Sequence, residues 1–161
     1  MNTALIQTIQ NAFPRSYQKP LLSHEECCSY REWLIALYRE TFEEVLPQVL
    51  VDFVSHYGGT ADDSCEAGYL INLLNVEGFR KLTELGADSK DIQKTEDNKK
   101  YLFANFNRPM ILALIDFLKE MRTWSSIDYY IEDIDSAIEY WQKQMVRGTV
   151  LPNDSSPCQP V

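Results

Sequence analysis

The strongest constraint on the fold is the spacing of apolar side chains in the last third of the sequence. Two consecutive segments, residues 107–124 and 126–147, carry apolar residues at intervals of three and four. Side chains at these intervals lie on one face of an α-helix, so each segment predicts a helix with one buried face. We expect Asn107 and Pro109 to open the first helix and Ser126 to cap the second. The two helices are predicted to be antiparallel, with the first one central in the fold.

Helix-terminal signals predict two further helices near the start of the chain. The first spans about residues 3–12, because Pro14 disfavours helix at the residue before it. A capping box formed by Ser23 and Glu26 starts the second helix near His24. The predicted buried stripe of this second helix continues through Cys27, Tyr30, Trp33, Leu34, Leu37 and Tyr38.

A third helix is expected in the first half of the chain. Its start is predicted between Thr41, which opens a second capping-box spacing, and Pro47, because proline is tolerated within a first turn. Its end is predicted near Tyr57, since the two glycines that follow can adopt the left-handed conformation that terminates helices.

The middle of the chain carries weaker local signals. For residues 67–74 a buried helix and a short strand both fit the apolar pattern, and we favour the helix. Asn75 is expected to cap a short helix that ends at Gly86. Residues 87–100 balance acidic and basic side chains around one strongly apolar residue, Ile92. They therefore predict a charged loop or flap, or a loosely docked solvated helix.

Together these elements predict an all-α, compact single-domain bundle of about six helices. A chain of 161 residues, 45% of them hydrophobic, suits one core. We assign residues 1–147 to the helical domain. Residues 148–161 begin at a helix-ending glycine and contain three prolines, so we assign them to a flexible tail.

The acidic composition limits the partners that the chain can bind. Its formal net charge is −9, whereas sequence-independent nucleic-acid binding needs Lys and Arg to neutralise phosphates. We therefore expect no direct nucleic-acid binding. No apolar run approaches the roughly 20 residues of a membrane span, and residues 1–13 lack the pattern of a secretion signal. These features predict a cytoplasmic protein with reduced cysteines and no membrane association.

The two histidines are the first places to look for catalysis. Asp52 and His56 stand one helical turn apart, so the carboxylate could orient the imidazole. The nucleophile that would complete such a group has no local signature. An exposed histidine near a helix end, interacting with the negative helix pole, is the alternative that we favour.

The cysteines raise the question of a metal site. His24, Cys27 and Cys28 could present two zinc ligands, with Cys65 or His56 supplying the others after folding. The short paired motifs of structural zinc sites are absent, however, and buried thiols are favoured. The sequence therefore assigns no catalytic residue, no metal ligand and no cofactor.

The most pronounced charge feature lies on the last predicted helix. Five acidic residues precede its first basic residue, Lys143, and four of them align opposite the apolar stripe. An acidic face can steer a basic partner, and tyrosines supply contact area at interfaces, although such a face can also be merely solvated. The candidate partner-binding residues are Asp128, Tyr129, Glu132, Asp133, Asp135, Glu139 and Tyr140.

Two parts of the sequence carry a family resemblance. The first comprises Ile9, Ala12, Phe13, Pro20, His24-Glu25-Glu26-Cys27 and Tyr30-Arg31-Glu32-Trp33, and the second comprises Asn107 to Leu118 with Asp135, Ala137, Tyr140 and Trp141. These patterns resemble a family of small uncharacterised bacterial helical domains, found notably in cyanobacteria. The family has no established activity, so the resemblance implies a helical fold and transfers no catalytic residue.

Two functional hypotheses follow. The first is a non-enzymatic acidic protein-interaction module that binds, and by binding inhibits, a basic protein partner, in the manner of immunity proteins or phage-encoded inhibitors. The alternative is a ligand-binding domain or enzyme with a pocket between helices, lined by His56, Asp52 and Cys65. A metal-dependent fold through His24 and a cysteine is a third option.

Overall fold

The computed structural model describes residues 1–60, 64–78, 86 and 88–148, and within these ranges the protein is all-α. Its α-helices are α1 (Thr3–Ala12), α2 (His24–Arg31), α3 (Arg39–Tyr57), α4 (Ser64–Leu74), α5 (Ser89–Leu102), α6 (Arg108–Arg122) and α7 (Ile131–Gly148). Short 3-10 helices are η1 (Pro14–Tyr17), η2 (Leu34–Ala36) and η4 (Asp128–Tyr130). The predicted all-α fold class is confirmed.

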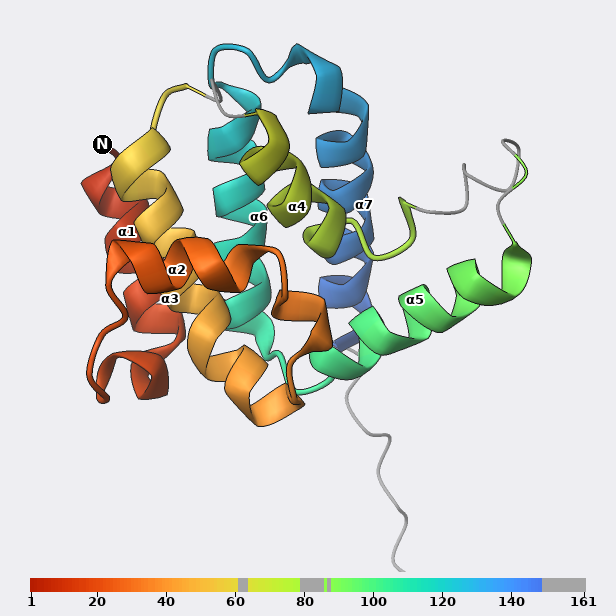
Figure 1. Cartoon of the computed structure of the whole chain (residues 1–161), viewed down its shortest axis with the longest axis horizontal. Coiled ribbons are helices and arrows are strands. Elements are labelled where there is room, and N and C mark those ends of the chain that lie inside the picture. The colour runs from red at the N-terminus through yellow and green to blue at the C-terminus, as the bar shows by residue number, and fades with distance from the viewer. Residues whose placement is uncertain (61–63, 79–85, 87, 149–161) are drawn as a thin grey trace, which may run out of the picture.

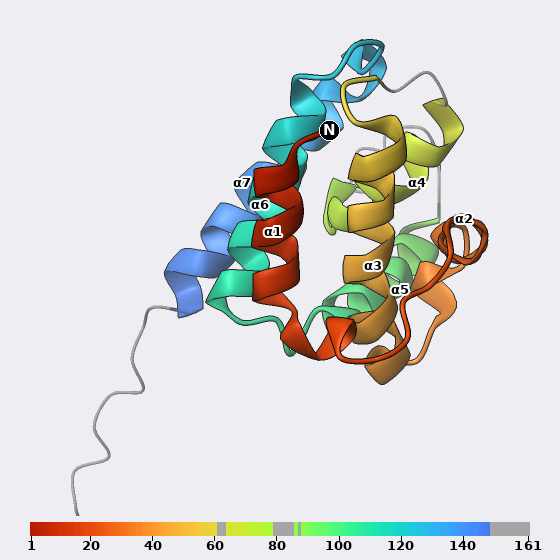
Figure 2. The same ribbon diagram turned by 90° about the vertical axis from the view of Figure 1, so that its left-hand side faces the viewer.

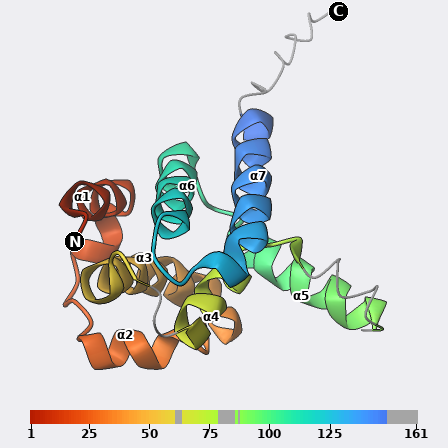
Figure 3. The same cartoon turned by 90° about the horizontal axis from the view of Figure 1, so that it is seen from above.

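The helices form two layers with α3 between them. Seen from above, α1, α6 and α7 follow one another along one side, and α2 and α4 lie on the other (Figure 3). α6 and α7 run antiparallel and pack closely, as predicted, and α1 packs on both α6 and α3 (Figures 1 and 2). α2 crosses the outer side of α3, and α4 bridges from α2 to α7.

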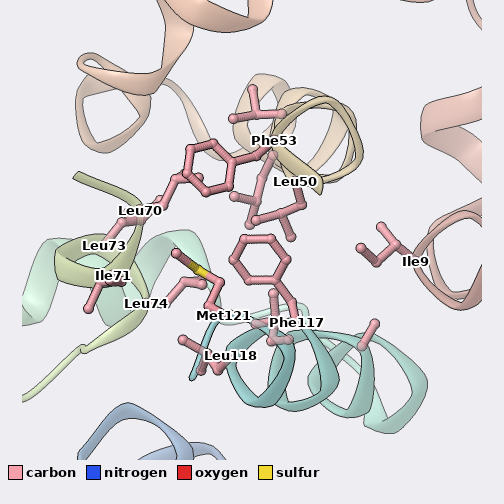
Figure 4. Packing of buried hydrophobic residues seen from close by; sticks show 14 of the residues in the cluster. Ile9, Leu50, Phe53, Leu70, Ile71, Leu73, Leu74, Phe117, Leu118 and Met121 are labelled. Carbon is pink, nitrogen blue, oxygen red and sulfur yellow. The ribbon is translucent and has the colours of Figure 1, made fainter. Parts of the chain in front are cut away.

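The core lies where α3, α4 and α6 meet. Phe53 of α3 and Phe117 of α6 point toward one another, with ring centroids 6.3 Å apart, and Phe53 also stacks on Trp124 at 5.6 Å. Leu70, Ile71, Leu73 and Leu74 of α4 close one side of these rings, and Ile9 of α1 approaches from the other (Figure 4). α6 thus buries the apolar face that its sequence spacing predicts.

Several predicted helix boundaries are confirmed. α1 has the predicted bounds, the Ser23–Glu26 capping box starts α2 at His24, and the Asn107 side chain caps α6 by accepting from the Met110 amide at 3.1 Å. Residues 67–74 belong to a helix, α4, as favoured. These boundaries depend on contacts within one turn of helix, which the sequence alone specifies.

The second predicted helix is shorter than its apolar stripe suggested. α2 ends at Arg31, and the chain turns through η2, so Leu34 is buried while Trp33 and Tyr38 stay exposed. The prediction of a continuous stripe to Tyr38 was wrong, because the turn changes which positions face inward.

The third helix begins earlier than predicted, at Arg39, so that Pro47 lies inside it and not in its first turn. Two side-chain donors of η1 reach carbonyls at or near the proline. The hydroxyl of Tyr17 donates to the Pro47 carbonyl at 2.8 Å, and the Ser16 hydroxyl donates to the carbonyl of Glu44. These bonds also attach η1 to α3.

The predicted cap at Ser126 was also wrong. Ser126 has a φ of 61°, which places it in the left-handed region. There it turns the chain, so that Ile127 is buried and η4 precedes α7, which begins only at Ile131. A capping side chain and a left-handed turn residue have similar sequence preferences, so the local pattern did not separate them.

Most of residues 87–100, predicted as a loop, flap or solvated helix, lie in α5. Asp88 caps α5 by accepting from the Lys90 amide at 2.9 Å. Its buried face includes Glu96 and Lys99, and the Lys99 ammonium donates to the side-chain and backbone oxygens of Asn72 and to the backbone of Asn75. Lys99 therefore binds the carboxyl end of α4. A buried face that is partly polar explains why hydropathy alone did not indicate a docked helix.

Some predictions concern residues that the structure does not describe. Of the short helix expected after Asn75, only residues 76–78 and 86 are described, and the Gly78 amide donates to the Asn75 carbonyl in a turn. Gly148 ends α7 as predicted, while the rest of the expected tail, 149–161, lies outside the described residues. No helix in the described ranges has both the length and the apolar character to span a membrane.

Lys99 leads to a prediction about pH. Burial lowers the pKa of Lys99 from 10.5 to about 8, because the ammonium has left water. Between these values the unfolded chain binds more protons than the folded one, so the free energy of unfolding should increase as pH increases. We expect the wild type to gain roughly 3 kcal/mol relative to Lys99→Met across this window, measured by urea denaturation. Exposed Lys94→Met should show a pH-independent difference, and a flat difference for Lys99→Met would contradict the prediction.

Candidate functional site

The structure joins two candidate sites that the sequence presented separately. The capping box places His24 at the start of α2, one turn before Cys28, and α3 presents Asp52 and His56 one turn apart. Because α2 packs across α3, His24 Nδ1 lies 3.0 and 2.9 Å from the two carboxylate oxygens of Asp52. We call His24, Cys28, Arg31, Asp52 and His56 the α2–α3 cluster.

His56 completes one side of this cluster. Its ring stacks on that of His24, with centroids 3.7 Å apart and planes 15° from parallel. His56 Nδ1 lies 3.0 Å from the Asp52 carbonyl oxygen and 3.1 Å from its Oδ1, so Nδ1 carries a hydrogen that it donates. The histidine is exposed near the end of α3, as favoured, but it also has a defined partner in His24.

Cys28 places a thiol beside the His24 ring. Its Sγ lies 3.6 Å from Nε2 and 3.8 Å from Nδ1. A thiol aligned with the lone pair of one nitrogen would be much farther from the other, so this is not the arrangement of an activated nucleophile. Burial raises the pKa of Cys28, which keeps the thiol protonated. The contacts therefore do not form a nucleophile–base pair.

Arg31 orients the Asp52 carboxylate from the buried side of the cluster. It was not identified as a site residue from the sequence. Its side chain is 1% exposed, and Nη2 donates to Asp52 Oδ2 at 2.9 Å while Nη1 donates to Glu66 of α4. The guanidinium also lies over Phe53 and Tyr57, 5.1 and 5.0 Å from the ring centroids. The available signal was its position four residues after Cys27, on the buried side of α2.

The remaining predicted cysteines do not join the cluster. Cys27 is buried in the core, as favoured, and burial raises its pKa to about 12. The side chain of Cys65 lies outside the described residues. Cys27 and Cys28 are both free thiols. Of the proposed zinc ligands, the described residues thus bring His24, Cys28 and His56 together, with Asp52 added.

The predicted acidic face is only partly brought together. Five of its seven residues are exposed on η4 and α7, and we call these five the acidic edge: Asp128, Tyr129, Glu132, Asp135 and Glu139. Asp133 turns inward, with Oδ1 3.5 Å from Asn75 Nδ2. Tyr140 is half-buried beside Trp141, and burial raises its pKa to about 12. Asp133 and Tyr140 are therefore not part of the acidic edge.

Asp135 and Glu139 of the edge have basic partners. Asp135 accepts from Arg122 of α6 at 2.6 Å, and Glu139 lies 2.7 Å from Lys143. These partners lower the pKa of Asp135 and of Glu139, so both carboxylates stay ionised. Glu132 and Asp133 lie in the first turn of α7, where negative charge also stabilises the positive helix end.

A pocket lies between the end of α5, the start of α6 and the end of α7. It has a volume of about 810 Å³, and the aromatic residues Phe103, Phe106, Tyr140 and Trp141 contribute to its lining. Three basic side chains, Lys100, Arg108 and Arg147, also line it. Neither Asp52 nor His56, which the pocket hypothesis placed in the lining, belongs to it, because both lie in the α2–α3 cluster.

Comparisons with protein-family models, curated proteins and solved structures find no match for this chain. The resemblance to small bacterial helical domains therefore stays a prediction, and any function must be argued from the geometry of the cluster, the edge and the pocket.

The contact between Arg31 and Asp52 leads to a stability prediction. Asp52→Asn keeps the shape of the side chain but leaves the buried guanidinium with Glu66 as its carboxylate partner. Breaking a buried ion pair from one side costs about 3 kcal/mol or more, so urea denaturation should show a loss of this size. Asp116→Asn, at an exposed position on α6, should change the free energy by less than about 0.5 kcal/mol. Equal effects of the two substitutions would contradict this role of Arg31.

Proposed function

We propose that this chain is a non-enzymatic protein-interaction module that docks a basic partner through the acidic edge. The observation that carries the proposal is Tyr129, which is 87% exposed between acidic side chains of η4 and α7. An exposed tyrosine offers a rigid, amphipathic contact surface that a partner can bury. Its acidic surroundings favour a partner that is basic.

The charges of the edge support fast and salt-sensitive association. Asp128, Glu132, Asp135 and Glu139 are all exposed, and the ion pairs with Arg122 and Lys143 neutralise two of them only in part. Exposed charges of one sign increase the rate of encounter with a partner of opposite sign. Binding over the active surface of that partner would inhibit it, as immunity proteins and phage-encoded inhibitors do.

The free thiols of Cys27 and Cys28 suit a reducing compartment, so we place this interaction in the cytoplasm. The formal charge of −9 opposes direct binding to nucleic-acid phosphates, so the proposed partner is a protein.

Charge reversal tests the docking surface. In the variant Asp128→Lys, Glu132→Lys, Asp135→Lys, we expect the captured basic partner to be lost or strongly reduced, because the edge no longer attracts it. The measurement is an affinity pull-down at low and moderate salt, followed by titration of the identified partner by calorimetry. Wild-type affinity should decrease as salt increases.

A matched control separates this edge from the charge of the whole chain. Glu25→Lys, Asp97→Lys, Asp116→Lys alters exposed residues on α2, α5 and α6. Three reversals of two units each change the formal charge from −9 to −3 in both variants. The control should retain the partner. A partner that binds both variants equally would remove the acidic edge from consideration.

A second function is favoured by the pocket between α5, α6 and α7. Its aromatic lining can accept an apolar group, and Lys100, Arg108 and Arg147 can attract a negative one. Lys100 lies 3.8 Å from Glu77, so the two arginines are the better anchors for an anion. We therefore propose, as the alternative, a binding site for an amphipathic organic anion.

A fluorescent probe tests this alternative. Anilinonaphthalene sulfonate combines an aromatic body with a sulfonate, and its emission should increase on binding in the pocket. The variant Arg108→Gln, Arg147→Gln should weaken that binding about tenfold or more, by loss of the charged hydrogen bonds. Lys143→Gln, outside this pocket, should bind the probe as the wild type does. A signal unaffected by the arginine substitutions would contradict an anion site.

A further inference from the structure

The α2–α3 cluster brings nitrogen, sulfur and oxygen donors from two helices to one point. Three residues, His24, Cys28 and Asp52, each offer one ligand atom, and these atoms lie within 4.8 Å of one another. All three residues are partly buried. We propose that these side chains form a binding site for Zn²⁺ or a closely similar divalent transition-metal ion. The site is separate from the acidic edge and does not depend on the docking function.

The donor set selects the class of ion. A cysteine sulfur and a histidine nitrogen suit zinc and its neighbours, whereas Mg²⁺ and Ca²⁺ prefer sites made only of oxygen. Asp52 supplies a carboxylate, which zinc also accepts. The mixed set therefore favours Zn²⁺ over the common alkaline-earth ions.

Two of the donor separations are close to those of a tetrahedral site. Bond lengths of zinc to nitrogen, oxygen and sulfur imply about 3.3 Å between nitrogen and oxygen ligands and about 3.5 Å between nitrogen and sulfur ligands. His24 Nδ1 lies 2.9 Å from Asp52 Oδ2 and 3.8 Å from Cys28 Sγ. These two separations are within about half an ångström of ligand spacing. Because Cys28 Sγ lies almost equally far from both ring nitrogens, its side chain must also rotate to aim the sulfur at an ion on Nδ1.

A second layer of contacts holds the carboxylate in place. Arg31 donates to Asp52 at 2.9 Å, and hydrogen bonds of this kind orient carboxylates at metal sites. The His24 ring is held in turn by stacking on His56. The site is therefore partly assembled before an ion arrives, which lowers the cost of ordering its ligands.

The local charges also favour a divalent cation. With Cys28 protonated, the guanidinium of Arg31 and the carboxylates of Asp52 and Glu66 leave one negative charge. A divalent ion bound to a Cys28 thiolate adds two positive charges and one negative charge, which makes the group neutral. Binding releases the thiol proton to solvent, and the hydrogen that His24 Nδ1 donates to Asp52 moves to Nε2, so that the lone pair of Nδ1 is free for the ion. The three protein ligands leave one coordination position for water, which can enter because the His24 side chain is 39% exposed.

Cobalt substitution tests the site directly. Adding Co²⁺ to the full chain should produce one equivalent of a tetrahedral complex, with intense visible d–d bands and a thiolate-to-cobalt charge-transfer band. Zn²⁺ should displace the cobalt and abolish both signals. Zinc affinity from calorimetry should decrease about tenfold or more in Cys28→Ala and in His24→Gln, since each removes a ligand.

The adjacent cysteine is the matched control. Cys27 is buried outside the cluster, so Cys27→Ala should retain the charge-transfer band and the zinc affinity of the wild type. Circular dichroism checks that each variant is folded. The wild-type spectrum decides the question even if a variant unfolds: absence of the charge-transfer band would overturn the proposal. So would a band that persists in folded Cys28→Ala or disappears in folded Cys27→Ala.

Discussion

The buried guanidinium of Arg31 connects the three helices around the α2–α3 cluster. Arg31 leaves the end of α2, donates to Asp52 of α3 and to Glu66 of α4, and lies over two aromatic rings of α3. A buried charge is tolerated only when such partners surround it. The position of α2 across α3, and with it the meeting of His24, Cys28 and Asp52, therefore depends on the two ion pairs that this side chain makes.

Through its contacts, α4 links Arg31 of α2 to α7. Glu66 near its start pairs with Arg31, while the carbonyl of Leu74 at its end accepts from the indole nitrogen of Trp141 at 2.9 Å. Between them, Gly68 permits a close approach of Tyr130, because a Cβ there would stand 2.6 Å from the tyrosine hydroxyl. The α2–α3 cluster and the helix that carries the acidic edge are thus held by opposite ends of the same short helix.

Much of the fold could be predicted because its signals are local. Capping at Ser23 and Asn107, and the apolar periodicity of α1 and α6, concern residues within one or two turns of each other. The errors arose where contacts between distant parts of the chain determine the local structure. The buried face of α5 includes Lys99, which needs the carbonyls of another helix, and Ser126 adopts a left-handed turn that a capping preference does not distinguish.

For the candidate sites, too, the local spacing could be predicted from the sequence, whereas the contacts between helices could not. Helical spacing placed Asp52 and His56 one turn apart and His24 close to Cys27 and Cys28, but only the crossing of α2 over α3 shows that the two groups meet. Spacing also aligned most of the acidic edge, yet Asp133 faces Asn75 at the end of α4, and Tyr140 lines the pocket between α5, α6 and α7. The position of Arg31 on the buried side of α2 was its only signal, and that position does not show its partners on α3 and α4.

The packing of α1 on α6 has a consequence for how the chain reaches this structure. Asn2 donates to Glu120 at 2.9 Å, across 118 positions of sequence, and Ile9 shares its core with Phe117. Contacts of such high sequence separation carry a large loop-closure cost and slow folding compared with a simple helical hairpin. During synthesis, the amino-terminal helices must therefore wait, with their apolar faces uncovered, until α6 has emerged from the ribosome. Exposure of this kind is what chaperones recognise in a growing chain.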